Sequence, residues 1–329
     1  MRVLILGGTR FVGRHLTEAA LAAGHRVTLF NRGRTSPGLF PEAEHIQGDR
    51  GRDLSLLEGR RWNVAIDVNG YLPKEVRASA RLLAGAVESY VYISTISVYS
   101  DFKTPGLRED APLEPPEPGD ETLDQVPPRG YGRLKALCER RVEEAVPGRT
   151  LVVRPCIVVG PWDPTGRFSY WVERSFGGGE ALAPGRPDRP VELIDARDLA
   201  AWVVRMADRR ETGIYNATGP ESTLTMGEML EACREETGGS TSFTWVSDTF
   251  LAERDVRLPF WLPEERFGYN LTDHGRAVSK GLTYQPLART IRDVHDWVSE
   301  DPEARKPFDF PPEREAELLR ARYGGTVSP

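Results

Sequence analysis

The chain has 329 residues and a formal net charge of −6, with 39% hydrophobic and 28% charged residues. These values are typical of a globular protein of one or two domains, and the negative charge argues against a nucleic acid as the main partner. No apolar run approaches the roughly 20 residues that span a bilayer, and the scattered cysteines and histidines form no metal-ligand pattern, so we predict a cytoplasmic protein without a metal site.

The first hundred residues alternate short apolar runs with stretches of helical spacing. Strands are predicted over 3–6, 27–30, 45–47, 64–68 and 90–94. Helical segments are predicted between them, over 11–23, 54–57 and 73–87. Continuous apolar strands that alternate with helices indicate a parallel sheet covered on both faces. We therefore predict the α/β class, with a Rossmann-type doubly wound sheet.

A glycine turn follows the first predicted strand, where residues 4–13 read LILGGTRFVG. A strand end, glycines and a helix N-terminus form an anion site, because free N–H groups and the helix dipole point toward a phosphate. The spacing of Gly7 and Gly13 exceeds the GxGxxG span by one residue but fits GxxGxxG, with Arg10 in the middle position. We predict a dinucleotide pyrophosphate here, with the Arg10 side chain either folded away or lying along the phosphates.

The end of the second predicted strand indicates which dinucleotide is bound. Residues 30–34 read FNRGR, with no carboxylate to bind a ribose 2′-hydroxyl. Arg32 and Arg34 suit a 2′-phosphate instead, which favours NADP(H) over NAD(H), unless both are ordinary solvated loop residues. Asp49, at the end of the third strand, is a candidate for contact with the adenine or simply a loop residue.

Residues 101–128 interrupt the alternation. They contain seven prolines and eight acidic residues, which predict a surface segment without regular structure. Because the segment directly precedes the helix with the most reactive side chains, a lid is an alternative to a solvated loop.

The helix predicted over 131–146 begins with the residues YGRLK. Tyr131 and Lys135 are four residues apart, so they share one helix face, and apolar residues continue that face inward. A free phenol has a pKa of about 10, and a neighbouring cation lowers such a pKa by stabilising the phenolate. We predict that Tyr131 exchanges a proton with a carbinol oxygen, its pKa lowered by Lys135 and a nicotinamide ring.

The rest of the chain predicts a second lobe. Strands are predicted over 150–154, 190–194 and 213–217, and helices over 198–207, 229–237, 288–298 and 313–323. Residues 156–189 are rich in Gly, Pro and aromatic residues and are expected to form loops on the substrate side. We predict an NAD(P)-binding Rossmann domain over 1–155, joined by about 190–218, and a smaller α/β substrate-binding lobe over 156–189 and 219–329.

Five motifs follow one another in a diagnostic order: GGTRFVG, STISVY, YGRLK, RPCIVVGP and IDARDLA. With them, roughly residues 1–300 resemble the extended and atypical short-chain dehydrogenase/reductase superfamily, in its NAD-dependent epimerase/dehydratase branch. The GGxxxxG turn is similar to that of an atypical subgroup assigned as sugar dehydratases, isoflavone-reductase-like proteins and RNA-binding proteins. The resemblance implies an NAD or NADP cofactor and a homodimer.

The resemblance also implies the roles of site residues. Tyr131 is the catalytic acid/base, Lys135 lowers its pKa, and Thr95 is the family's hydroxyl residue, with Ser94 and Ser97 as alternatives. The predicted cofactor-binding set comprises Gly7, Gly8, Thr9, Arg10, Phe11, Val12, Gly13, Asn31, Arg32, Arg34, Asp49, Arg50, Asn69, Ser94, Tyr131, Lys135, Pro155 and Ile157.

The chain departs from the family pattern at three positions. Arg10 replaces the middle glycine, and Asn69 follows the fourth strand, where it either lines the cofactor or turns the chain. Asp195 stands where nucleotide-sugar members usually carry histidine, which weakens the prediction of a nucleoside-diphosphate sugar. On the substrate side, Trp162 and Trp261 are the pocket candidates. Arg167, Arg186 and Arg189 are either anion-binding residues or solvated loop residues.

Two functions compete at this point. The first is an NAD(P)-dependent epimerase, dehydratase or oxidoreductase that acts on a sugar-like or small carbonyl substrate. The alternative is a catalytically silent, nucleotide-dependent RNA-binding or sensor protein on the same fold. Its one candidate surface is the basic run of Arg50, Arg52, Arg60 and Arg61.

Overall fold

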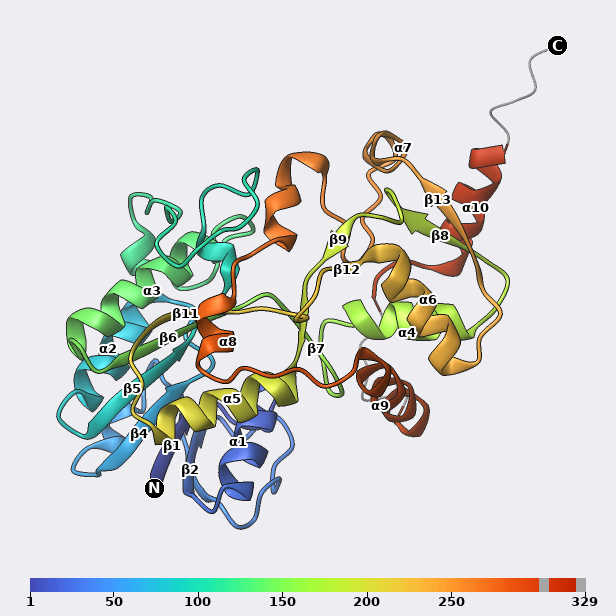
Figure 1. Ribbon diagram of the computed structural model, residues 1–329. Coiled ribbons are helices and arrows are strands. Elements are labelled where there is room, and N and C mark those ends of the chain that lie inside the picture. Colours follow the sequence, from blue (N-terminus) through green and yellow to red (C-terminus); the bar gives the residue numbers. More distant parts are fainter. Residues whose placement is uncertain (302–307, 324–329) are drawn as a thin grey trace.

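The computed structural model describes residues 1–301 and 308–323, and its centre is a seven-stranded sheet (Figure 1). The strands are β1 (Arg2–Leu6), β2 (Arg26–Asn31), β3 (Glu44–Gln47), β4 (Trp62–Asp67), β5 (Val87–Ile93), β6 (Thr150–Pro155) and β11 (Gly213–Ala217). Their order is β11-β6-β5-β4-β1-β2-β3, and each neighbouring pair is parallel. The predicted Rossmann-type sheet is confirmed.

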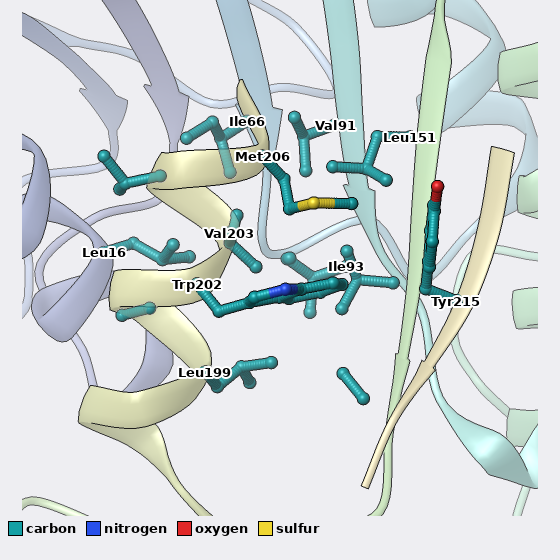
Figure 2. Packing of buried hydrophobic residues seen from close by; sticks show 14 of the residues in the cluster. Leu16, Ile66, Val91, Ile93, Leu151, Leu199, Trp202, Val203, Met206 and Tyr215 are labelled. Carbon is teal, nitrogen blue, oxygen red and sulfur yellow. The ribbon is translucent and has the colours of Figure 1, made fainter. Parts of the chain in front are cut away.

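Both faces of this sheet are buried, which explains why its strands are almost continuously apolar. Side chains alternate between the faces along β1, so that Val3 and Ile5 join one hydrophobic cluster while Leu4 and Leu6 join another. Helices α1 (Val12–Ala22) and α5 (Ala196–Asp208) supply the first cluster, and α2 (Pro73–Leu83) and α3 (Tyr131–Ala145) supply the second. Figure 2 shows the first face, where Trp202 and Met206 of α5 lie against side chains of the sheet.

The chain direction places a crevice at one edge of the sheet. From β1 the chain continues outward through β2 and β3, whereas β4, β5 and β6 continue outward on the other side. Ligands of such sheets bind at the carboxyl ends of the strands where this order reverses. Here the strand ends carry Gly7 after β1, Asn31 at the end of β2, and Ser94 after β5.

A third hydrophobic cluster forms the other lobe, around Trp171, Met229 and Ile291. Its strands pair in three two-stranded sheets: β7 (Ile157–Val159) with β10 (Leu193–Asp195), β8 (Glu180–Pro184) with β13 (Ser242–Val246), and β9 (Pro190–Val191) with β12 (Leu224–Thr225). The remaining α-helices are α4 (Arg167–Phe176), α6 (Met226–Thr237), α7 (Asp248–Glu253), α8 (Gly275–Ser279), α9 (Leu287–Glu300) and α10 (Pro312–Tyr323). Four 3-10 helices complete the set: η1 (Leu54–Leu57), η2 (Ile96–Val98), η3 (Asp120–Thr122) and η4 (Glu264–Asn270).

Two predicted elements differ from the structure. The single strand expected over 190–194 is two strands interrupted at Glu192, whose carboxylate accepts hydrogen bonds from the backbone N and hydroxyl of Thr272. Residues 156–189, expected as loops, contain α4, which buries Phe168 and Trp171 in the third cluster. The Gly- and Pro-rich segments on either side of α4 made this helix difficult to predict from the sequence.

The segment over 101–128 is irregular, as predicted. It contains only η3 and two isolated bridges, from Tyr99 to Leu113 and from Leu107 to Thr272. No helix among the described residues combines the length and apolar character needed to cross a membrane.

Candidate functional site

A cleft of about 710 Å³ lies at the carboxyl ends of the strands. It is lined by the glycine turn, the segments that follow β2, β3, β4 and β5, the start of α3, and the segment from Pro155 to Arg167. Every residue of the predicted catalytic and cofactor-binding sets contributes to its lining. Predicted residues up to 150 positions apart in the sequence, Gly7 and Ile157, are therefore brought to one cavity by the parallel topology.

The glycine turn leaves no room for side chains at its centre. A Cβ atom on Gly13 would lie 2.8 Å from the backbone N of Gly8, and one on Gly8 would lie 2.6 Å from Leu29 Cδ2. The Thr17 hydroxyl lies 2.8 Å from the Gly8 carbonyl and 2.9 Å from that of Gly13, which holds the turn against α1. The first turn of α1 has no acidic residue, so its N–H groups present a positive end to the cleft.

Asn31 fixes the turn to the end of β2. Its amide donates to the Gly7 carbonyl at 2.9 Å, and its side-chain oxygen accepts from the Gly33 N–H at 2.9 Å. The two arginines that follow it, Arg32 and Arg34, are exposed. Neither their guanidinium groups nor that of Arg10 forms an ion pair with any residue that the structure describes, so three cations stand available at the rim of the cleft.

Arg50 lines the cleft, but its contacts differ from the predicted contact with a cofactor. Its guanidinium is buried and donates two hydrogen bonds of 2.8 Å to Asp67, one of 3.1 Å to Asn69 and one of 2.6 Å to Ser79. Although burial raises the pKa of Asp67, the ion pair with Arg50 lowers it below the ordinary value and holds the carboxylate ionised. Arg50 therefore supports Asn69 beside the glycine turn, and its charge is already paired. Asp49 also lines the cleft, and its carboxylate accepts from the Gly51 N–H.

Tyr131 and Lys135 both face the cleft from α3. The Tyr131 ring is 40% exposed, whereas Lys135 is 1% exposed. The Lys135 ammonium donates to the carbonyls of Gly70 at 2.9 Å and Ile93 at 2.6 Å, and no hydrogen bond joins it to Tyr131 within the described chain. The Tyr71 ring is near both, with its centroid 6.3 Å from that of the Tyr131 ring and 5.5 Å from the ammonium.

The surroundings of Tyr131 and Lys135 shift the pKa of each side chain. Desolvation and the neighbouring phenols of Tyr71 and Tyr269 raise the pKa of Tyr131, although a hydrogen bond with Thr95 and the charge of Arg167 oppose them. In the protein alone Lys135 does not lower this pKa, because its ammonium is directed toward backbone carbonyls; the lowering predicted for Lys135 together with a nicotinamide ring stays a prediction. Burial lowers the pKa of Lys135 to about 8.

The hydroxyl residues after β5 separate into two groups. Thr95 begins η2, where its hydroxyl accepts from the Ser97 N–H at 3.1 Å, and the Ser97 hydroxyl lies 3.1 Å from that of Tyr269. Ser94 instead donates to buried Glu139, which also binds Arg154. Thr95 is thus the hydroxyl near Tyr131, while that of Ser94 belongs to an internal network.

Several cleft residues were missed by the sequence interpretation, among them Tyr71, Thr165 and Tyr269. Tyr71 follows β4, Thr165 lies between β7 and α4, and Tyr269 comes from η4. The local sequence around these positions carries no motif, since their placement depends on tertiary packing. Arg167, considered only as one of three anion-binding candidates, lines the same cavity.

The other substrate-side candidates have structural roles. Trp162 lies under the Arg14 guanidinium, at 3.5 Å, and Trp261 donates to Asp248 at 2.8 Å. Arg189 is buried and bound to Asp248 and Glu264. None of these three candidates lines the cleft, so the expectation of a Trp162 and Trp261 pocket is wrong.

Gly132 allows α3 to approach the segment that carries Thr95. A Cβ atom at this position would lie 2.0 Å from the Ser97 carbonyl oxygen. Gly132→Ala is therefore expected to lower the free energy of unfolding by about 1–3 kcal/mol and to displace Tyr131, with a loss of activity. Chemical denaturation measures the change in the free energy of unfolding. Gly85→Ala is the matched control, because nothing lies within 4 Å of its Cβ position; equal stability of the two variants would contradict the packing argument.

No group of three or more His, Cys, Asp or Glu side chains in the described chain is arranged to hold a metal ion. The cleft lining presents phenol, hydroxyl, ammonium and guanidinium groups, together with the carboxylates of Asp49 and Glu75.

Comparison with known proteins gives a family match over most of the sheet. A model of the NAD dependent epimerase/dehydratase family matches residues 3–70 and 61–218. A dTDP-6-deoxy-L-talose 4-dehydrogenase (NAD(P)(+)) from Kitasatospora kifunensis is 27% identical over 265 residues, which cover 74% of this chain and 82% of that protein.

Two further similarities are to a chloroplast protein and to a solved structure. The chloroplast stem-loop binding protein of 41 kDa b from Arabidopsis thaliana is 27% identical over 258 residues, covering 72% of this chain but only 63% of that protein. The solved structure of MoeE5 with UDP-glucose and NAD superposes with a TM-score of 0.66 at 19% identity, covering 92% of this chain and all of that one. The latter similarity supports the fold alone.

Proposed function

Because the chain belongs to the NAD dependent epimerase/dehydratase family, and so to enzymes of the NAD(P)-dependent epimerase, dehydratase or reductase type, we propose that Tyr131 is its catalytic acid/base. The substrate would be a carbinol or ketone, sugar-like or small. The observation that carries this proposal is the sharing of one cleft by the glycine turn, the free arginines and the Tyr131–Thr95–Lys135 group.

The residues of the cleft fit a dinucleotide. The close approach at Gly8 and Gly13 leaves backbone N–H groups open to a pyrophosphate, and Asn31 holds this arrangement in place. When bound, the nicotinamide group supplies or accepts the hydride. Tyr131 then exchanges a proton with the substrate oxygen, and Thr95 orients its hydroxyl.

Nucleotide binding tests the proposal directly. The purified protein is titrated with NADPH and with NADH by following nucleotide fluorescence, and denatured protein is analysed for nucleotide that remained bound through purification. Saturable binding of one nucleotide per chain is expected, and Gly13→Ala should abolish it because the added Cβ meets the turn. A chain that binds neither nucleotide would overturn the proposal. Retained nucleotide would favour an epimerase, and free exchange a reductase.

We propose NADP(H) as the preferred cofactor, since Arg32 and Arg34 carry unpaired charge at the end of β2. A hydrogen bond to a charged group contributes about 1.5–3 kcal/mol, which corresponds to roughly 10- to 100-fold in affinity. The double variant Arg32→Ser/Arg34→Ser should therefore lose that much affinity for NADPH and little for NADH. Arg52→Ser is the control. An equal loss for both nucleotides would contradict a 2′-phosphate site.

The alkaline pH dependence should follow Lys135. Its lowered pKa of about 8 means that the ammonium is present below this pH and is lost as the pH rises through it. If the ammonium is needed, kcat/KM, which reports the free enzyme, falls above about pH 8. The pH profile of Lys135→Met should lack this limb, whereas Lys74→Met should retain it. A wild-type profile that stays flat from pH 7 to 9 would contradict the assignment.

The RNA-binding alternative rests on the similarity to the stem-loop binding protein. Its candidate surface is weak, because Arg50 is buried against Asp67 and Arg60 is paired with Glu44. A salt-dependent RNA complex that forms equally well with Tyr131→Phe would support this alternative. The homodimer, the cytoplasmic location and the division into two domains stay predictions.

A further inference from the structure

Arg167 introduces a positive charge into the lining of the cleft. It is the first residue of α4, it is half-buried, and it lines the cavity together with Tyr131, Ser97 and Tyr269. Its charge lowers the pKa of both phenols, against the stronger effect of desolvation. The guanidinium is therefore close enough to influence the position where the substrate oxygen would meet Tyr131.

A chain of hydrogen bonds through Thr165 fixes the orientation of the Arg167 side chain. Its Nε donates to the Thr165 hydroxyl at 3.0 Å. That hydroxyl lies 2.8 Å from both carboxylate oxygens of Asp163, which is buried. This chain of contacts uses one N–H group of the guanidinium and leaves its terminal nitrogens for a ligand.

No carboxylate in the described chain forms an ion pair with Arg167. Other arginines of the same lobe differ in this respect: Arg174 is paired with Glu315, and Arg189 with Asp248 and Glu264. A half-buried guanidinium costs desolvation free energy unless a counter-charge offsets it. Buried Asp163 is linked by hydrogen bonds to this guanidinium only through Thr165, so the terminal nitrogens have no direct counter-charge, and a ligand anion in the cleft would supply one.

The acidic residues that the structure places in the cleft wall do not supply this counter-charge. They are Asp49 and Glu75. Both lie beside Gly51, where an added Cβ would be 3.3 Å from each carboxylate, on the β3–β4 side of the site. Although the whole chain carries a net charge of −6, the cleft lining is positive at Arg167, a distribution that attracts anions.

We propose that Arg167 binds an anionic oxygen group of the substrate, a carboxylate or a phosphate carried close to the reacting carbon. This inference rests on the proposed function, because it assumes that the reacting oxygen lies at Tyr131. It narrows the substrate from any carbinol or ketone to an acidic one. The guanidinium would form two parallel hydrogen bonds with such a group and so orient the reacting carbon.

Three aromatic probes of similar shape test this proposal: benzaldehyde, 4-carboxybenzaldehyde and 4-formylphenyl phosphate. Each is titrated by calorimetry into protein saturated with the oxidised nucleotide that it binds more tightly, so that aldehyde reduction does not interfere. An anionic probe should bind at least about tenfold more tightly than benzaldehyde, which is the effect of one charge-assisted contact. The better of the two anionic probes distinguishes a carboxylate from a phosphate.

Arg167→Gln should remove this preference while leaving nucleotide affinity within about twofold of the wild type. Arg186→Gln is the matched control, since Arg186 is an exposed arginine of the same region, pairs with Asp188 and lies outside the cleft lining. If the nucleotide binds but the anionic probes bind no better than benzaldehyde, the anion site is wrong and the dinucleotide site stands. A parallel loss of nucleotide affinity in Arg167→Gln would assign Arg167 to the cofactor instead. If no nucleotide binds, the proposed function falls and this inference falls with it.

Discussion

Tyr131→Phe is expected to lower kcat by about 10²- to 10⁴-fold, the usual contribution of a positioned acid or base. The substitution removes only the hydroxyl, so the ring keeps its place beside Tyr71 and the start of α3. Because the raised pKa of the phenol keeps it protonated at neutral pH in the protein alone, the hydroxyl is ready to donate a proton to a ketone oxygen. The reverse reaction requires the phenolate and so should become faster as the pH rises, until Lys135 loses its proton.

Steady-state kinetics and nucleotide titration together check this expectation. NADPH affinity should stay within about twofold, which separates a lost proton transfer from a lost cofactor site. Tyr170→Phe is the control: its hydroxyl has no hydrogen-bond partner in the described chain and lies outside the cleft lining. Unchanged kcat in Tyr131→Phe would remove the phenol from the mechanism.

Arg50→Met is expected to lower the free energy of unfolding by about 3–5 kcal/mol. Asp67 is fully buried, and the substitution leaves its charge with the Tyr90 hydroxyl as the remaining strong partner. Asn69 and Ser79 lose a donor in the same step. The loss should be visible as a large shift in the midpoint of chemical denaturation.

Two further variants make this test specific. Arg52→Met changes an exposed arginine nearby and should alter stability by no more than about 0.5 kcal/mol. Arg50→Met/Asp67→Leu removes both charges and should recover part of the lost stability, because no uncompensated carboxylate remains. If Arg50→Met were as stable as the wild type and instead lost nucleotide affinity, Arg50 would be a cofactor ligand, as the sequence alone suggested.

The sheet could be predicted because its strands are determined by local runs of the sequence. Each strand is an apolar run, and two-faced burial of a parallel sheet requires such runs. The same holds for the turn at Gly7–Gly13 and for the common face of Tyr131 and Lys135, which follow from spacing along the chain. The topology then brings these features to one edge of the sheet.

The remaining features depend on partners that are distant in the sequence. Arg50 meets Asp67 seventeen residues later, so its pairing is invisible in the motif around it. Tyr269 reaches the cleft from η4, 172 positions after its contact Ser97. The raised pKa of Tyr131 in the protein alone could not be predicted, because spacing on a helix indicates a shared face, while the direction of the Lys135 ammonium depends on the carbonyls around it.

The most direct test of the account is a crystal structure with NADP⁺ bound. The account predicts the pyrophosphate on the backbone of residues 7–13 and the nicotinamide ring in the cleft between Tyr131 and the segment from Pro155 to Ile157, with the Lys135 ammonium nearby. A dinucleotide bound elsewhere, or a nicotinamide ring remote from the Tyr131 hydroxyl, would contradict it.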